Sequence, residues 1–348
     1  MQKRFTSLSL FILFHSVPWT SGQNLCPDPD DILPCICIPI ASLGSAEVEC
    51  DDATSSDDIY FAFNDATWPV KNLTKFSLMY NDDVRVLPGG VFGDTTFDTI
   101  NLAVTSVSRV DPAALLASKD RLLSLVIDGS PLREFPWEIL PQLANLKKLD
   151  LRDIGLTTLP LLQSDSLEEF SVSSNEIDHL EAGWSLPNLR RLYLSSNPIR
   201  DVPAGFLSDF VKLEIFSCAD CDLGPTLSTK SLEFHSESMQ DIHLSWNSFS
   251  NMEVDAITGL QPDTVLYVSY NDIRELTEES FRPMLKILSL GDGFIFLGSN
   301  PVECDCSMAW VVLNPDFLAS VNGYCMDGTE FKDLDPNVFE DCVGNDDP

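Results

Sequence analysis

Cys218 and Cys221 form a C-x-x-C pair, a spacing that is typical of redox chemistry between thiols. A redox thiol must reach solvent, so the direction of each side chain decides whether the pair can react. Leu213 and Leu223 flank the pair and set its register within a leucine-rich stretch. In that register both cysteines replace residues that point into the core. We therefore predict buried thiols or a structural bridge, with redox chemistry as the alternative.

Other residues give little indication of catalysis. His179, His235 and His243 remain once an N-terminal signal is removed, and none has the spacing of a helical metal motif. The sequence contains no nucleophile elbow, Walker loop or dinucleotide fingerprint. No pair among the 54 acidic residues stands out as a glycosidase pair. We predict a protein that is not an enzyme, with no catalytic residue, metal site or cofactor.

Regularly spaced leucines must position these residues. Residues 189–199 match the pattern L-x-x-L-x-L-x-x-N-x-L of a leucine-rich repeat, with isoleucine at its last position. Alternation predicts a short strand in which Leu192 and Leu194 face a core and Tyr193 faces outward. Asn197 then ends the strand, because a buried amide can satisfy the backbone groups of a turn.

The same pattern recurs along most of the chain. We predict about ten repeats over residues 73–299, within an α/β-type leucine-rich repeat solenoid, or horseshoe. Its parallel short strands should line the concave face, while proline-containing segments on the convex side should be extended or form short helical turns. Residues 285–290 and 295–300 both fit the last repeat. The predicted repeats start at Leu73, Phe97, Leu122, Leu146, Leu167, Leu189, Leu213, Met239 and Asp263.

Cysteines cluster at both ends of this array. Residues 23–72 form a predicted N-terminal cap with a first irregular unit, and residues 300–348 form a C-terminal cap. An end repeat leaves an apolar face that needs a cover, and a disulfide-stapled segment provides one. A zinc site is less favoured at the N-terminal end because no histidine is nearby. The cysteines concerned are Cys26, Cys35, Cys37 and Cys50, then Cys304, Cys306, Cys325 and Cys342.

The first residues and the overall charge indicate an exported protein. Residues 1–22 combine a basic start, an apolar run and small residues, which predicts a cleaved signal peptide. No later run is long enough to span a membrane, so we expect a secreted, extracellular product in which Asn72 could carry a glycan. The net charge of −33 argues against nucleic acid or an anionic membrane as the partner.

The residues between and after the strand leucines should form the concave binding surface. Two sets stand out, and we expect both to contact a protein partner. The alternative is that these are variable solvent-facing positions, with charges paired between strands, as Arg190 beside Glu168 or Glu214. The aromatic group consists of His243, Trp246, Tyr267 and Tyr270, and the basic strip consists of Lys147, Lys148, Arg152, Arg190 and Arg191, with Tyr193 between the two sets.

Several segments resemble known families. The opening of the C-terminal cap, Asn300 to Cys306, resembles that of extracellular leucine-rich proteins, which implies that Cys304 pairs with Cys325 or Cys342 and Cys306 with the other. Residues 134–141, 183–189, 218–225 and 313–315 resemble secreted arthropod proteins similar to the leucine-rich, non-catalytic subunit of the decapod shrimp luciferase, Oplophorus-luciferin 2-monooxygenase.

The second resemblance implies a partner role. The chain would bind and stabilise a small secreted catalytic chain that oxidises a luciferin, and the oxidation would belong to that chain. No catalytic residue carries over. The alternative function is a free-standing secreted recognition or adhesion protein, in innate immunity or the extracellular matrix.

Overall fold

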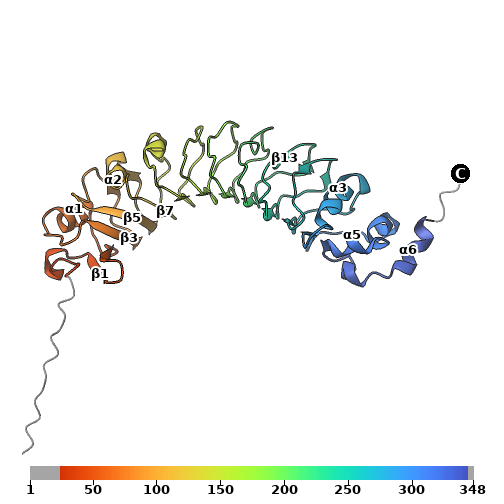
Figure 1. Cartoon of the computed structure of the whole chain (residues 1–348), viewed down its shortest axis with the longest axis horizontal. Helices are drawn as coiled ribbons and strands as arrows, with labels where there is room; N and C mark the ends of the chain where they lie inside the picture. Colours follow the sequence, from red (N-terminus) through yellow and green to blue (C-terminus); the bar gives the residue numbers. More distant parts are fainter. Residues whose placement is uncertain (1–23, 344–348) are drawn as a thin grey trace, which may run out of the picture.

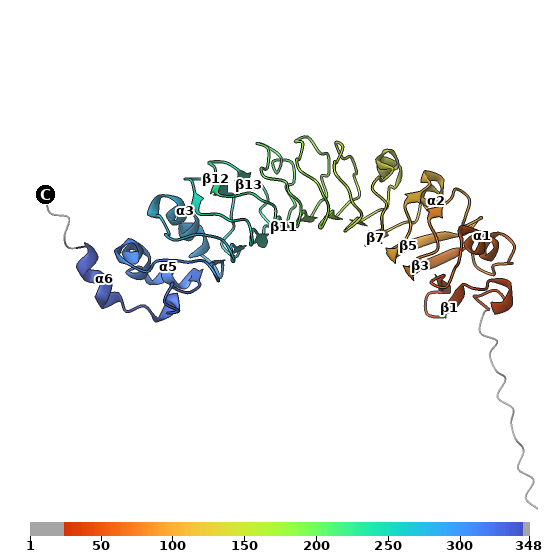
Figure 2. The ribbon, with the colours of Figure 1, turned by 180° about the vertical axis from the view of Figure 1, so that it is seen from behind.

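The computed structural model describes residues 24–343, which form one curved solenoid (Figure 1). The predicted signal segment 1–22 lies outside these residues. The strands lie side by side along the inner curve of the arc, and the connecting segments form its outer side (Figures 1 and 2). No helix within the described range is long and apolar enough to cross a membrane.

A 13-stranded sheet runs through the arc. Its first pair, β1 with β2, is antiparallel, and every later pair is parallel. Parallel neighbours require a crossover, and each repeat supplies one through its convex segment. In sheet order the strands are β1 (Ile36–Ile40), β2 (Ser45–Glu49), β3 (Asn72–Asn81), β5 (Thr96–Thr105), β7 (Ser124–Asp128), β8 (Lys148–Asp150), β9 (Glu169–Ser171), β10 (Arg191–Tyr193), β11 (Ile215–Ser217), β14 (Asp241–His243), β17 (Val265–Tyr267), β18 (Phe294–Phe296) and β19 (Val321–Asn322).

The convex side is mostly irregular, as predicted, and holds short paired strands and short helices. The paired strands are β4 (Val86–Leu87) with β6 (Arg109–Val110), β12 (Thr226–Leu227) with β15 (Asn251–Met252), and β13 (Leu232–Glu233) with β16 (Ile257–Thr258). The helices outside the C-terminal cap are η1 (Pro29–Asp31), α1 (Ser56–Asn64), α2 (Pro112–Leu116), η2 (Trp137–Gln142) and α3 (Glu278–Leu288). At 11 residues, α3 is the exception to the expected short turns.

Helix α3 also decides which segment forms the last repeat. Leu285 and Leu288 are buried within α3, whereas Ile295 lies in β18 and pairs with Leu266 of β17. Residues 295–300 therefore provide the repeat. Helix formation competes successfully with the strand pattern here because α3 has an acidic first turn, Lys286 in its last turn and one continuous apolar face.

The core is continuous from cap to cap. Leu192 and Leu194 are fully buried, and Leu192 lies between Phe170 and Phe216 of the neighbouring strands. Each repeat thus stacks its buried strand residues on those of the next repeat, which is how a short unit buries an apolar face that it could not bury alone.

Disulfides close both ends of this core. In the N-terminal cap Cys26 bonds Cys37 and Cys35 bonds Cys50. In the C-terminal cap Cys304 bonds Cys325 and Cys306 bonds Cys342, which is one of the two arrangements that the family resemblance allowed. The helices of the C-terminal cap are η3 (Cys306–Met308), α4 (Ala309–Val312), α5 (Pro315–Ala319), η4 (Phe331–Asp333) and α6 (Pro336–Val343).

Candidate functional site

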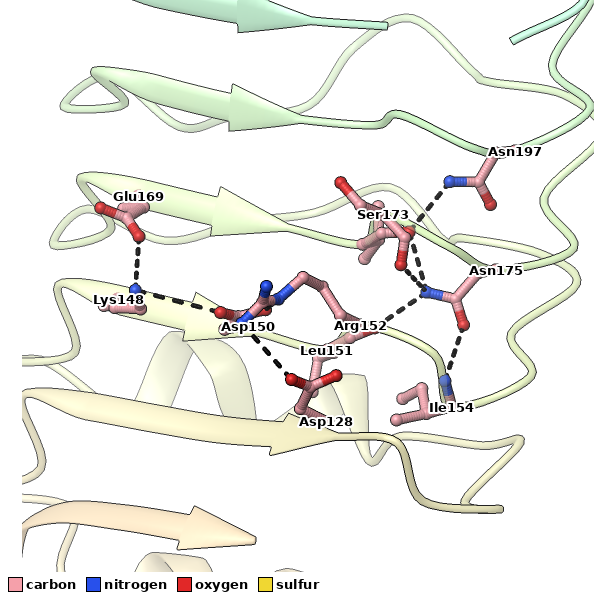
Figure 3. A network of polar contacts seen from close by, with 11 residues as sticks. Asp128, Lys148, Asp150, Leu151, Arg152, Ile154, Glu169, Ser173, Asn175 and Asn197 are labelled. Carbon is pink, nitrogen blue, oxygen red and sulfur yellow. Dashed lines mark hydrogen bonds and ion pairs between the residues drawn. The ribbon is translucent and has the colours of Figure 1, made fainter. Parts of the chain in front are cut away.

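A row of buried side chains, the asparagine ladder, lies at or just after the end of each strand; most of its members are polar, and Ile154 is apolar. Asn175 shows its chemistry: Nδ2 donates to the Leu151 carbonyl at 2.8 Å and Oδ1 accepts from the Ile154 N–H at 3.2 Å, which joins two repeats (Figure 3). Buried backbone groups need such partners. The ladder consists of Asn81, Thr105, Ser130, Ile154, Asn175, Asn197, Cys221, Asn247, Asn271 and Asn300.

The residue before each ladder position has a left-handed backbone, with φ between 50° and 64°. We call these residues the left-handed column. Few side chains adopt this conformation without cost, yet bulky residues occur here as well as one glycine. The column consists of Tyr80, Val104, Gly129, Asp153, Ser174, Ser196, Asp220, Trp246, Tyr270 and Ser299.

Strands β14 and β17 bring the predicted aromatic group together as two stacked pairs. His243 stacks on Tyr267 with ring centroids 4.5 Å apart, and Trp246 stacks on Tyr270 at 4.1 Å with an interplanar angle of 7°. Trp246 and Tyr270 remain 58% and 49% exposed. Stacking explains how these large rings tolerate an open surface, because each covers one face of its neighbour.

Phe296 of β18 extends the row of His243 and Tyr267, with its centroid 6.3 Å from that of Tyr267. Sequence reasoning missed Phe296. The sequence pattern could have identified Phe296, because it lies between Ile295 and Leu297 just as His243 lies between Ile242 and Leu244. The sequence did not decide, however, which of two segments forms the last repeat.

Burial shifts the titration of this row. Desolvation lowers the pKa of His243, and the nearby Asp241 carboxylate opposes that shift. Desolvation raises the pKa of Tyr267, and Asp241 raises it further. Both shifts favour the uncharged side chain. The row therefore presents neutral rings at neutral pH, which suits contact with another apolar or aromatic surface.

Every residue of the basic strip pairs with a carboxylate of this chain. Lys148 lies 2.7 Å from Glu169, Lys147 lies 2.9 Å from Glu168, and Arg190 pairs with Glu214 of the next strand. Arg191 also approaches Glu169, at 3.5 Å. The cross-strand pairing considered for Arg190 is thus present, with Glu214 as the acid. Partner contact by the basic strip stays a prediction.

Arg152 lies at the centre of the most buried part of this network. Its Nε lies 2.8 Å from an Asp150 carboxylate oxygen, and its second contact is with Asp128 at 3.5 Å (Figure 3). Asp150 itself is buried, and its hydrogen bond is the main cause of the raised pKa of Arg152. These contacts hold the Arg152 guanidinium against carboxylates of its own sheet.

Cys218 and Cys221 are bonded to each other and fully buried. Cys221 occupies a ladder position, and Oδ1 of Asn247 accepts a hydrogen bond from its backbone N–H at 2.9 Å. The pair thus replaces a ladder asparagine by a covalent link within one turn. Asn72, the predicted glycan acceptor, is exposed at the start of β3, where its side chain accepts a hydrogen bond from Thr96.

These features define a class of protein. Residues 188–210 match the Leucine Rich Repeat family, and the fold matches a chain in the structure of an octameric complex of Latrophilin 3, Unc5D and FLRT2 (LRR). That match has a TM-score of 0.56 and 21% identity, and it covers 76% of this chain and 82% of the other. The chain has the fold of a leucine-rich repeat solenoid, with disulfide bonds near both ends.

Two relatives narrow the comparison. The chain is 28% identical over 327 residues to the Oplophorus-luciferin 2-monooxygenase non-catalytic subunit of Oplophorus gracilirostris, which covers 92% of this chain and 88% of that subunit. It is 33% identical over 125 residues to Toll-like receptor 3 of Boselaphus tragocamelus, which covers 34% of this chain and 13% of that receptor. The predicted resemblance to the luciferase subunit is confirmed.

Proposed function

We propose that this chain is a secreted, non-catalytic subunit that binds and stabilises a small catalytic luciferase chain through its concave face. The similarity to the Oplophorus subunit along nearly the whole chain supports the class of partner. The five disulfides and the signal-like residues 1–22 support export.

The observation that carries this proposal is the aromatic group, in which Trp246 and Tyr270 are exposed just after strands β14 and β17. Large aromatic rings at the centre of an interface supply much of its binding energy, whereas uncovered rings reduce solubility. Trp246 and Tyr270 both have the left-handed backbone of the column, and their rings stack on each other. A partner that covers both rings would recover the cost of exposing them.

Co-expression with the small catalytic luciferase chain tests the proposal. We expect one peak on size exclusion at micromolar concentration, and a loss of affinity of about thirtyfold on Trp246→Ala or Tyr270→Ala, the size of a typical interface hot spot. Tyr80→Ala is the matched control, because Tyr80 is 76% exposed in the same column but lies on β3, at the other end of the arc.

Two independent peaks would overturn the partner assignment. Binding of microbial glycans or cell-surface proteins instead, lost on the same aromatic substitutions, would establish the recognition or adhesion function. Equal loss on Tyr80→Ala would show that the aromatic group is not the contact.

A further inference from the structure

Asp220 lies next to Trp246 in the left-handed column. The Asp220 N–H donates to the Ser245 carbonyl at 2.9 Å, just as the Trp246 N–H donates to the Ser269 carbonyl at 3.1 Å beside Tyr270. Asp220 and Tyr270 therefore flank Trp246 on opposite sides, one repeat away in each direction. Tyr270 covers one face of the indole, so the uncovered face lies on the side away from Tyr270, which is the side of the repeat that contains Asp220.

The carboxylate of Asp220 is exposed, and among residues 24–343 no cationic side chain pairs with it. This differs from the neighbouring part of the concave face, where Glu168, Glu169 and Glu214 each pair with a lysine or arginine. The strand segments at 213–221, 239–247, 263–271 and 292–300 contain no lysine or arginine at all. Apart from Glu214, the acidic residues of these segments form no ion pair with a lysine or arginine within the part of the chain that the structure describes.

An aromatic face beside a free carboxylate matches the chemistry of a guanidinium group. A flat cation stacks on an indole, the best of the aromatic rings for this contact, while its N–H groups point outward to a carboxylate. A lysine ammonium would form the ion pair without the planar stacking. The net charge of −33 would also attract a basic surface from a distance.

We propose that Trp246 and Asp220 form a binding site for an arginine side chain of a basic protein partner. This inference rests on the proposed function, in that the concave aromatic group is the contact surface, and it assigns the chemistry of the partner at that surface. The arginine would lie between the indole and the carboxylate, and so extend the stack of Trp246 and Tyr270 by one further layer.

Fluorescence anisotropy with labelled Gly-Arg repeat peptides, compared with Gly-Lys and Gly-citrulline peptides of the same length, tests the site without any luciferase chain. We expect the arginine peptide to bind tightest. Asp220→Asn and Trp246→Leu should each weaken it by about fivefold, the range of one cation–aromatic contact. Asp222→Asn is the matched control, because it removes the same charge from an exposed residue that also has positive φ.

Equal weakening by Asp220→Asn and Asp222→Asn would show general charge attraction and overturn the site. Equal binding of the arginine and citrulline peptides would overturn it as well. Since no catalytic chain is present in this assay, failure of the arginine site can be told apart from failure of the co-expression experiment.

Discussion

Residues of the left-handed column have a strained backbone with positive φ, which lowers stability. Val104 is β-branched, has φ of 53° and is 52% exposed, so no burial offsets its backbone strain. Trp246 and Tyr270 have the same conformation but gain a stacking contact. Substitution of a strained residue that makes no stacking contact can raise the free energy of unfolding. A strained residue within a stack lowers the free energy of unfolding but provides a contact surface.

Val104→Asn should therefore raise the free energy of unfolding by about 1 kcal/mol, because asparagine tolerates the left-handed region better than valine. The shift in the urea unfolding midpoint measures this. Val126→Asn is the control, because Val126 lies within strand β7 and asparagine is unfavourable there. An unchanged or lower midpoint for Val104→Asn would contradict the assignment of strain to this residue.

At the scale of the element, the asparagine ladder holds one repeat to the next. Asn247 donates to the carbonyls of Cys218, Leu244 and Ser245 and accepts from the N–H groups of Cys221 and Leu223. Thr105, at an equivalent position, has only a hydroxyl, which contacts Ser130 and the Val107 N–H. The N-terminal repeats have longer strands, since β3 and β5 are each ten residues long and pair at eight positions.

We expect Asn247→Ala to lower the free energy of unfolding by about 3 kcal/mol, because it leaves buried backbone groups without partners. Thr105→Ala should cost about 1 kcal/mol, since fewer hydrogen bonds are lost. Chemical denaturation followed by circular dichroism gives both values. Similar costs at the two positions would show that the amide is no better than a hydroxyl in this ladder.

At the scale of the whole molecule, each repeat contacts its neighbours and the two caps lie far apart at the ends of the arc (Figure 1). Stability in such a chain is close to a sum of local and nearest-neighbour contributions. The bond between Cys304 and Cys325 spans 21 residues, and β19 pairs with β18 just beside it. A change in this cap should therefore act on the last repeats first.

Replacing Cys304 and Cys325 together by serine should reduce local stability by about 3 kcal/mol, through the loop that the disulfide closes. Hydrogen exchange should become faster in β18 and β19 and stay unchanged in β3 and β5. Uniformly faster exchange along the chain would instead show that the solenoid unfolds as one cooperative unit.

Local periodicity allowed the fold to be predicted from the sequence. The spacing of leucines sets the strand, the direction of Leu192 and Tyr193, and the inward positions of Cys218 and Cys221, because side-chain direction follows backbone period alone. The repeat also placed the aromatic group on adjacent strands. These features need no knowledge of contacts between distant residues.

Contacts between repeats were decided only by the tertiary structure. Which carboxylate neutralises Arg190, which cysteines bond within each cap, and how closely Trp246 approaches Tyr270 all depend on side-chain geometry across strands. The strand pattern fits residues 285–290 as well as residues 295–300, but Leu285 and Leu288 lie in helix α3. Only the structure therefore identified Phe296 as a strand residue. The pairing of the basic strip and the unpaired carboxylate of Asp220 follow from the same cause: a repeat pattern fixes the direction of a side chain, but only packing fixes its partner.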